Sequence, residues 1–375
     1  MPAKIMIIAG EASGDTHGAS LIRALRKRAP DIEVFGVGGD KMKSEGMHLY
    51  YHVDQLSYIG FSEVVRHLSF FRRVFRHLLE IAGQRQPDLI VLIDYPGFNL
   101  RFAKSAKRRG FKIFYFVAPQ VWAWAKWRAK KMARYIDRLA VLFDFEVSFF
   151  QQYGLETKFV GHPLVDKLVV RESKEEFCKR IDMDPQKPIL GLFPGSRHQE
   201  LSSLLPEMLA TAQLLSAQHP HLQVVVSKAP TIDAKKIKTI CQAYPQVRLV
   251  EGHTYEMMNY VTAGIVASGT ATLEMAFFKT PFVVVYKVSP ITFAIGKKVI
   301  KIPHIGLVNV VAGREIVPEF IQKDAAAEKV APVIQQYLYN ERIRKQVQDD
   351  LSVIKQKLGE PGAAERTAEL VLEMI

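Results

Sequence analysis

Short apolar runs that end in a glycine-rich or polar turn recur along the whole chain, and they constrain the fold more than any other feature. Each run has the length of a strand and is followed by a pattern of helical spacing. The runs lie at 5–9, 32–37, 89–93, 112–117, 139–143 and 158–160 in the first half, and at 189–193, 223–227, 247–250, 264–267 and 282–286 in the second. Strands that alternate with helices form parallel sheets covered by helices. The pattern therefore predicts an α/β protein with two mostly parallel sheets.

The length of 375 residues favours two domains, because one hydrophobic core rarely serves more than about 250–300 residues. The polar stretch 171–187 separates the two series of strands and places the boundary near residues 165–185. We expect a first domain over 1–168, a second over 169–345 and C-terminal helices over 346–375.

The net charge of +13 favours an anionic partner, and the charge is concentrated between Arg101 and Arg138, where Asp137 is the one acid. Charge alone leaves nucleic acid, an anionic bilayer surface and phosphorylated substrates open. The two cysteines, Cys178 and Cys241, have no metal-ligand spacing and favour a reducing compartment. No apolar stretch has the roughly 18 residues of a membrane span, and the N-terminal run is too short for a signal peptide. We therefore expect a cytoplasmic protein.

Six polar or glycine-rich segments directly follow predicted strands. They are 10–15, 94–99, 119–124, 161–163, 194–200 and 268–274. In open parallel sheets, ligands bind beyond the carboxyl ends of the strands, where loops expose helix N-termini. Six such coincidences favour a cleft between two facing domains over six unrelated structural turns.

The segment after the strand at 189–193 has the composition of a diphosphate site. A Pro-Gly turn leads into a helix whose start supplies unpaired backbone N–H groups. The candidate ligands are Ser196, Arg197 and Glu200. Arg197 offers a rigid fork of donors that matches phosphate oxygens. The alternative is a capped strand–helix junction with a surface arginine.

The segment after the strand at 264–267 adds further donor-site candidates: Ser268, Gly269, Thr270 and Glu274. The first three open a helix and present N–H groups and hydroxyls to a phosphate. Glu274 lies one turn further on, where its carboxylate can accept both ribose hydroxyls of a nucleotide; the alternative is an acid that complements the helix dipole. Asn309 and Arg314 are further candidates, with a surface loop as the alternative.

Asp94 is the best candidate for a general base in the first half. It directly follows an apolar strand, where partial burial raises the pKa of a carboxyl group toward a useful range. The alternative is an Asp that initiates the turn before a Tyr-Pro-Gly sequence. Segment 10–15 matches neither a Walker loop nor GxGxxG, but Ser13 and Asp15 are placed to contact a sugar or a phosphate. The histidines are scattered and no acidic pair has metal-ligand spacing, so we expect no metal.

A long amphipathic helix is expected over 61–83. It carries the side chains of a helix that lies on an anionic membrane: Phe70, Phe71, Arg72, Arg73, Phe75 and Arg76. The alternative is an ordinary core helix with a solvated basic face. Trp122, Trp124 and Trp127 lie close together among basic residues, where acyl chains, lipid headgroups or simple packing would each account for them.

Five motifs together resemble those of the lipid-A-disaccharide synthase family. They are Gly-Glu-Ala-Ser-Gly-Asp at 10–15, Ile-Asp-Tyr-Pro-Gly-Phe-Asn at 93–99, Ala-Pro-Gln-Val-Trp-Ala-Trp at 118–124, Pro-Gly-Ser-Arg-His-Gln-Glu at 194–200 and Ser-Gly-Thr-Ala-Thr-Leu-Glu at 268–274. Their order and spacing match over essentially the whole chain. The resemblance implies a GT-B architecture, with two Rossmann-like domains that face a cleft. It also implies C-terminal helices that pack back on the first domain or on a partner chain in a homodimer.

The resemblance further implies the reaction. This family comprises inverting, metal-independent glycosyltransferases of lipopolysaccharide biosynthesis, and we expect no cofactor. The implied substrates are UDP-2,3-diacylglucosamine and 2,3-diacylglucosamine 1-phosphate, and the products are a β-1,6-linked disaccharide 1-phosphate and UDP. By its motif, Asp94 is the base for the acceptor 6-hydroxyl and Arg197 clamps the UDP diphosphate. We expect contacts to the acceptor, or to a sugar or phosphate, from Ser13, Gly14, Asp15 and Gln120.

The chain departs from the family pattern at Gly97, where some relatives carry a second Asp, and at Gln120, where some carry Ser. The implied partner surface is the anionic cytoplasmic face of the inner membrane, with peripheral association. Two other functions stay open at this point. One is a GT-B transferase or epimerase that acts on UDP-N-acetylglucosamine. The other is a basic nucleic-acid-binding protein, for which the chain has no recognisable module.

Overall fold

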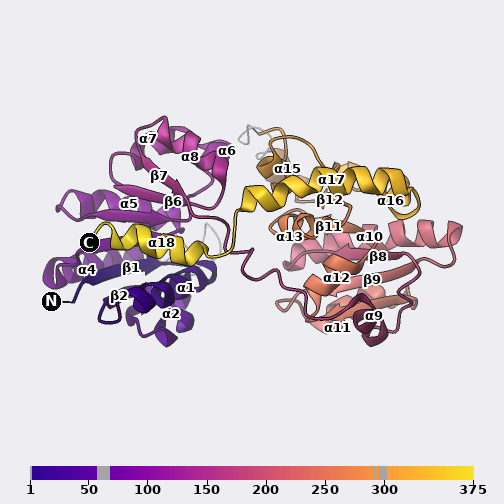
Figure 1. Ribbon diagram of the computed structural model, residues 1–375, viewed down its shortest axis with the longest axis horizontal. Coiled ribbons are helices and arrows are strands. Elements are labelled where there is room, and N and C mark those ends of the chain that lie inside the picture. The colour runs from indigo at the N-terminus through magenta and orange to yellow at the C-terminus, as the bar shows by residue number, and fades with distance from the viewer. Residues whose placement is uncertain (1, 57–67, 291, 295–301) are drawn as a thin grey trace. The chain divides into compact units, whose positions relative to one another are not determined.

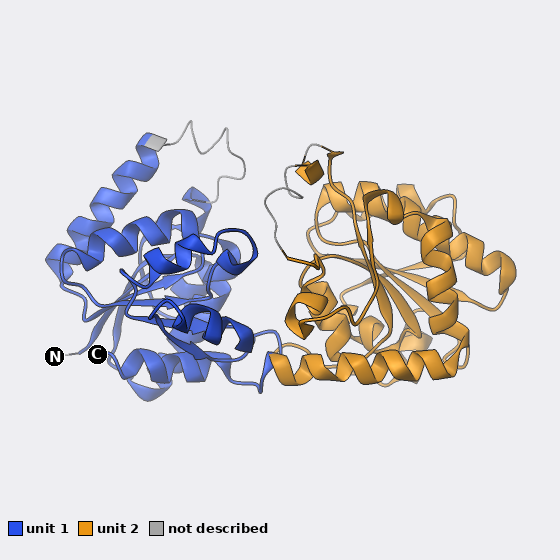
Figure 2. Ribbon diagram, turned by 90° about the horizontal axis from the view of Figure 1, so that it is seen from above, with its two compact units in different colours: residues 1–165, 358–375 blue, residues 166–357 orange. Residues whose placement is uncertain are grey.

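The computed structural model describes residues 2–56, 68–290, 292–294 and 302–375. The chain forms two compact units: unit 1 contains Met1–Val165 and Leu358–Ile375, and unit 2 contains Asp166–Lys357 (Figure 2). The chain therefore passes between the units twice, and the C-terminal segment 346–375 is divided at Leu358.

Unit 1 is built on a seven-stranded parallel sheet in the order β3-β2-β1-β4-β5-β6-β7. Figure 1 labels β1, β2, β6 and β7 of this sheet. The strands are β1 (Lys4–Ala9), β2 (Glu33–Gly38), β3 (His48–His52), β4 (Leu89–Ile93), β5 (Ile113–Phe116), β6 (Arg138–Val141) and β7 (Glu156–Phe159). The central strands β1 and β4 are almost wholly buried, as is typical of parallel strands with helices on both faces.

The helices of unit 1 come from both ends of the chain. They are α1 (Ala12–Arg28), α2 (Asp40–Ser44), α4 (Leu68–Arg85), α5 (Pro96–Lys107), α6 (Val121–Trp124), α7 (Trp127–Met132), α8 (Asp144–Gln151) and α18 (Ala363–Leu372). α4, α5 and α7 share one hydrophobic core with alternate residues of the strands, such as Ile90 and Leu92. α18 packs along α1, and the Arg366 Nε donates to the Val160 carbonyl at 2.8 Å. The C-terminal helix therefore completes unit 1 of its own chain.

Unit 2 contains a six-stranded parallel sheet in the order β10-β9-β8-β11-β12-β13. The strands are β8 (Ile189–Phe193), β9 (Gln223–Lys228), β10 (Val247–Glu251), β11 (Ala263–Ala267), β12 (Phe282–Tyr286) and β13 (Glu319–Ile321). The helices are α9 (Lys174–Arg180), α10 (His198–Gln218), α11 (Ala234–Cys241), α12 (Thr254–Tyr260), α13 (Ala271–Phe277), α15 (Leu307–Ala312), α16 (Ala327–Tyr339) and α17 (Glu341–Leu358). In both sheets the strand order reverses near the centre, between β1 and β4 and between β8 and β11. Such a switch point leaves a crevice at the carboxyl ends of the strands.

Every strand expected from the sequence is present, which confirms two parallel sheets. Two edge strands, β3 and β13, were not expected. Their side chains are mostly half-buried, so the sequence there lacks a continuous apolar run. The described part of the helix expected over 61–83 is α4, and residues 61–67 lie outside the described residues. Within the described ranges, no helix is long and apolar enough to cross a membrane.

Candidate functional site

All six polar segments lie at the carboxyl ends of parallel strands, as the sequence predicts. Two pairs of them fall at the switch points. Segments 10–15 and 94–99 follow β1 and β4, and we call this region the unit 1 edge. Segments 194–200 and 268–274 follow β8 and β11 and line a cavity of about 620 Å³, which we call the unit 2 pocket.

The unit 2 pocket collects most of the donor-site residues that the sequence predicts. Those that line it are Ser196, Arg197, Glu200, Ser268, Gly269, Thr270 and Glu274. The two segments are about seventy residues apart in sequence and meet because β8 and β11 pair directly in the sheet. The pairing of these two strands therefore creates the pocket.

The first wall of the unit 2 pocket is the loop between β8 and α10. Gly195 has φ +93°, a backbone conformation that favours glycine, and a Cβ there would lie 2.3 Å from the Glu200 Oε2. Glu200 caps the helix start: it accepts from the Arg197 backbone N–H at 3.3 Å and from the Arg197 Nη1 at 3.0 Å. The Arg197 side chain is still 81% exposed. Arg197 is thus tethered at one nitrogen and open to a ligand at its others.

The second wall carries Glu274, which is partly buried. Burial raises the pKa of Glu274, and the positive charge of Lys167 partly offsets the rise. Burial together with the charge of Glu274 raises the pKa of Tyr255 to about 12, so its hydroxyl remains a donor at neutral pH. Tyr255 and the hydroxyls of Ser227 and Thr254 line the pocket but were missed in the sequence. Ser227 lies near the end of β9, and Thr254 and Tyr255 follow β10 at the start of α12, positions at carboxyl ends of strands that could have revealed them.

Asn309 and Arg314 were predicted donor-site residues, but neither is among the residues that line the unit 2 pocket. Asn309 is completely buried, donates to the Val317 carbonyl at 2.8 Å and accepts from the Ile316 N–H at 2.8 Å. Arg314 forms an ion pair with Asp350 of α17 at 2.5 Å. Both side chains are occupied with holding unit 2 together.

At the unit 1 edge, backbone strain is concentrated around Asp94. Asp94, Tyr95 and Val117 have φ values of +46°, +49° and +65°, in the left-handed region that residues other than glycine rarely adopt. Each such residue costs on the order of 1–3 kcal/mol and persists only where the surrounding structure enforces it. These three residues follow the adjacent strands β4 and β5. Strain of this kind is typical of functional sites.

The pKa of the Asp94 carboxyl group is shifted toward neutral pH. Burial raises its pKa to about 6, the nearby charge of Glu11 adds to the rise, and the Tyr95 N–H opposes it. The Asp94 backbone carbonyl accepts from the Asn99 Nδ2 at 2.8 Å and from the Tyr115 hydroxyl at 2.5 Å. Glu11 and Asn99 belong to motifs quoted from the sequence; Asn99 acts on Asp94 within one segment, whereas Glu11 is brought near it by the pairing of β1 with β4.

The other residues predicted for the acceptor differ in their accessibility. Asp15 is buried and accepts from the backbone N–H groups of Gly39 at 2.7 Å and Met42 at 3.0 Å, so its carboxylate is committed to the start of α2. Gly14 is also buried. Ser13 is exposed in the first turn of α1, and Gln120 is exposed at the start of α6, beyond β5.

The predicted membrane residues of α4 divide between solvent and core. Arg72, Arg73 and Arg76 are exposed, whereas Phe70 and Phe71 are half-buried. The Phe75 ring packs against Phe98 and Phe102 of α5, with centroids 5.6 Å apart in each case. Phe75 therefore contributes to the core of unit 1 rather than to an exposed apolar face.

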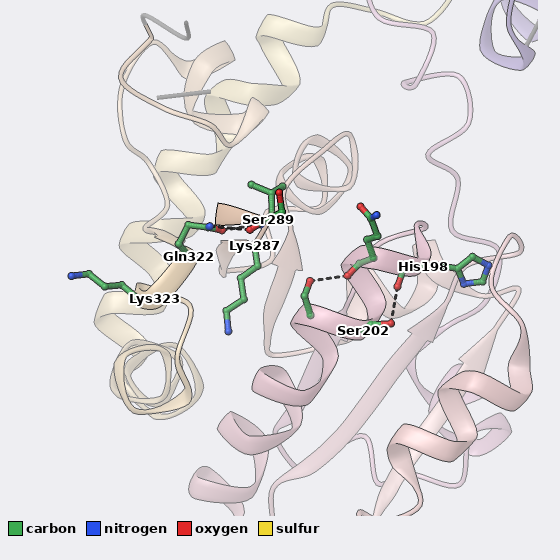
Figure 3. Close-up of a pocket in the computed structure, with 9 residues that line it drawn as sticks. His198, Ser202, Lys287, Ser289, Gln322 and Lys323 are labelled. Carbon is green, nitrogen blue, oxygen red and sulfur yellow. Dashed lines mark hydrogen bonds between the residues drawn. The ribbon is translucent and has the colours of Figure 1, made fainter. Parts of the chain in front are cut away.

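A second cavity in unit 2, of about 710 Å³, lies beside the first turns of α10 (Figure 3). Figure 3 shows His198 and Ser202 on α10 and Ser289, Gln322 and Lys323 across the cavity from them. Much of its polar lining is engaged internally; the Gln322 amide, for example, exchanges hydrogen bonds with Val288 at 2.8 and 2.9 Å. From the predicted segment 194–200 it contains His198 and Gln199, but none of the individual site residues predicted from the sequence. Among the described residues, no group of histidine, cysteine or acidic side chains could hold a metal ion.

Comparison with known proteins identifies relatives over the full length. The family model described as lipid-A-disaccharide synthetase matches residues 5–374. The chain is 40% identical to the lipid-A-disaccharide synthase of Geobacter sulfurreducens over 99% of this chain and 97% of the relative. It is 42% identical to the lipid-A-disaccharide synthase of Syntrophus aciditrophicus over the same shares of the two chains.

Solved structures with low sequence identity share the fold. A putative UDP-N-acetylglucosamine 2-epimerase from Listeria monocytogenes matches with a TM-score of 0.66 at 14% identity, over 99% of this chain and 96% of that chain. The calicheamicin glycosyltransferase CalG4 matches with a TM-score of 0.61 at 16% identity, over 100% of this chain and 98% of that chain. At this identity the likeness shows the fold alone, which is that of GT-B glycosyltransferases and epimerases.

Proposed function

The chain belongs to the lipid-A-disaccharide synthase family of glycosyltransferases, and we propose that it joins UDP-2,3-diacylglucosamine to 2,3-diacylglucosamine 1-phosphate. The products are the β-1,6-linked lipid A disaccharide 1-phosphate and UDP. The unit 2 pocket is the observation that links this function to particular residues. It brings the segments 194–200 and 268–274, which are far apart in the sequence and both suited to binding phosphate, together in one cavity.

In this proposal the unit 2 pocket binds the UDP part of the donor. Arg197 and the N–H groups at the start of α10 neutralise the diphosphate, which removes the need for a metal ion. Glu274 accepts hydrogen bonds from the ribose hydroxyls, and the Tyr255 ring forms a wall for the base. Glu200 keeps Arg197 and its loop in place, as its two hydrogen bonds to that residue indicate.

Asp94 of the unit 1 edge is the proposed base. The acceptor 6-hydroxyl oxygen attacks the anomeric carbon, Asp94 takes the hydroxyl proton, and the bond from that carbon to the phosphate oxygen of UDP breaks with inversion. A pKa of about 6 leaves most of the carboxyl ionised at neutral pH while keeping useful basicity. Asn99 and Tyr115 are positioning residues, because they bind the Asp94 backbone carbonyl.

Both proposed substrates are acylated, so we place the reaction at the anionic cytoplasmic face of the inner membrane. The net charge of +13 and the exposed arginines of α4, Arg72, Arg73 and Arg76, support electrostatic attraction to such a surface.

Measuring UDP release with each substrate omitted in turn tests the proposal. We expect release only when the acylated donor and the acceptor are both present, unchanged by a metal chelator. Turnover of UDP-N-acetylglucosamine without any acceptor would instead support an epimerase.

A further inference from the structure

A third cavity, in unit 1, lies between α5 and α7 and has a volume of about 400 Å³; we call it the α5–α7 pocket. Its buried lining is apolar and includes Ala103, Met132 and Ile136. The proposed function uses none of its lining residues. The pocket therefore has an apolar interior without an assigned role.

The rim of the α5–α7 pocket is strongly basic. Its cations are Arg101, Lys104, Arg128, Lys131 and Arg134. Among the described residues, none of the five has a carboxylate within ion-pair distance, whereas Lys107 pairs with Asp137 and Arg138 with Glu373 in the same part of unit 1. No acidic side chain of the described ranges lines the pocket. A group of cations without acidic partners around an apolar cavity is complementary to an anion that carries an apolar chain.

Two exposed indole rings adjoin this basic rim. Trp124 is 45% exposed and Trp127 is 59% exposed, which makes them unusual among large apolar side chains. The Arg128 guanidinium lies 4.5 Å from the Trp124 ring centre and 5.3 Å from that of Trp127, and the Lys131 Nζ lies 4.6 Å from the Trp127 ring. Tryptophan beside Lys and Arg is typical of residues at the level of lipid headgroups.

We propose that the α5–α7 pocket binds the phosphate headgroup of an anionic glycerophospholipid, with Trp124 and Trp127 at the bilayer surface. Five cations without an acidic partner among the described residues, together with two exposed indoles, exceed what one free phosphate would require, and both features suit a bilayer. The inference rests on the proposed encounter with a lipid surface, but it adds a specific site outside the unit 2 pocket and apart from the arginines of α4. The competing occupant is the 1-phosphate of the acceptor, because Pro96 and Gly97, close to Asp94, also line the pocket.

Cosedimentation of the full chain with vesicles tests this site. The vesicles are phosphatidylcholine alone or phosphatidylcholine mixed with an equal amount of phosphatidylglycerol. We expect Arg128→Gln/Lys131→Gln to lower binding to the mixed vesicles about 25-fold, because each cation near an anionic surface contributes about a factor of five. The matched control, Lys235→Gln/Lys236→Gln, removes two exposed lysines of α11 in unit 2 and should bind as wild type does.

UDP release in phospholipid-free detergent micelles separates the two occupants. The proposal expects Arg128→Gln/Lys131→Gln to retain the wild-type KM for the acceptor and the wild-type kcat. A raised acceptor KM with unchanged vesicle binding would assign the pocket to the acceptor phosphate and overturn the proposal. Equal loss of vesicle binding in the α11 control would overturn it as well, since attraction would then depend on net charge. Failure of the proposed function is distinct, because it would appear as absent UDP release in wild type.

Discussion

The two switch points share a topology but achieve their geometry by different means. Around the unit 2 pocket, the lining residues with positive φ include three glycines, Gly195, Gly252 and Gly269. At the unit 1 edge, the residues with positive φ are Asp94 and Tyr95 in the loop after β4. Val117, directly after the adjacent strand β5, has positive φ as well. Glycine adopts this conformation without steric strain, whereas other residues do so at a cost of about 1–3 kcal/mol each.

This difference indicates that the two switch points serve different steps of the reaction. Glycine turns let the backbone approach a ligand closely, which suits recognition of a diphosphate by N–H groups. Strained residues with side chains fix one functional group in one direction, which suits a single base such as Asp94. We therefore expect substitutions in unit 2 to weaken nucleotide binding as well as stabilisation of the leaving group, and substitutions in unit 1 to slow the chemical step without weakening nucleotide binding.

The largest effect is expected from Asp94→Asn, which removes the proposed base while retaining the size of the side chain. General-base catalysis typically contributes about 10²–10⁴-fold, so kcat should fall by that order. The measurement is UDP release at saturating substrates. Asp31→Asn, at an exposed position of unit 1, is the control and should behave as wild type. An Asp94→Asn enzyme with full kcat would remove the base assignment.

Arg197→Ala should lower turnover by at least about 100-fold, the usual effect of removing one group that stabilises a leaving oxyanion. Arg314→Ala is a sharp control, because Arg314 was a donor-site candidate in the sequence but pairs with Asp350 away from the pocket. The structure predicts near wild-type turnover for Arg314→Ala. If the two variants lose activity equally, the unit 2 pocket is not the donor site.

A smaller effect is expected in the pH profile. With an Asp94 pKa of about 6, kcat/KM should fall as the pH drops below about 6, because the protonated carboxyl cannot accept a proton. Glu11→Gln removes a negative charge that raises this pKa, so the acidic limb should move to lower pH. If the acidic limb of the Glu11→Gln profile lies at the same pH as in wild type, ionisation of Asp94 is not the cause of the pH dependence.

Glu146 provides a test in unit 1 that concerns stability rather than catalysis. Burial raises its pKa from 4.5 to about 7, although the Trp122 Nε1 donates to it at 3.0 Å. Between these two pH values the folded chain binds the proton and the unfolded chain does not, so stability falls as the pH rises through this window. The loss is about 3 kcal/mol by order of magnitude. Glu146→Gln should therefore be more stable than wild type at pH 8 in denaturant unfolding, and the difference should vanish near pH 4.

The sequence predicted the fold well because strands in parallel sheets are continuous apolar runs that end in a glycine-rich or polar turn. The same logic located segments 94–99, 194–200 and 268–274, since the carboxyl ends of paired strands must meet. It did not predict the hydrogen-bond partners of buried polar side chains. The hydrogen bonds of Asn309 and Asp15 come from backbone groups that tertiary structure brings to them, and spacing carries no record of such partners.

Helical periodicity has a similar limit. The apolar spacing of α4 is the same whether a phenylalanine meets a membrane or a neighbouring helix, and the structure places Phe75 against α5. The exposed indoles of Trp124 and Trp127 likewise became evident only once α6 and α7 were seen to leave them uncovered. Exposure is a property of the assembled unit, so a sequence pattern predicts it poorly.

The different roles of the two switch points can be tested most directly by calorimetric titration of UDP into Arg197→Ala and Asp94→Asn. The account predicts weaker UDP binding for Arg197→Ala, by a factor on the order of 10–100, the cost of about 1.5–3 kcal/mol for one charge-assisted hydrogen bond. It predicts wild-type affinity for Asp94→Asn. If Asp94→Asn weakened UDP binding as much as Arg197→Ala, or if Arg197→Ala bound UDP as wild type does, the account would be contradicted.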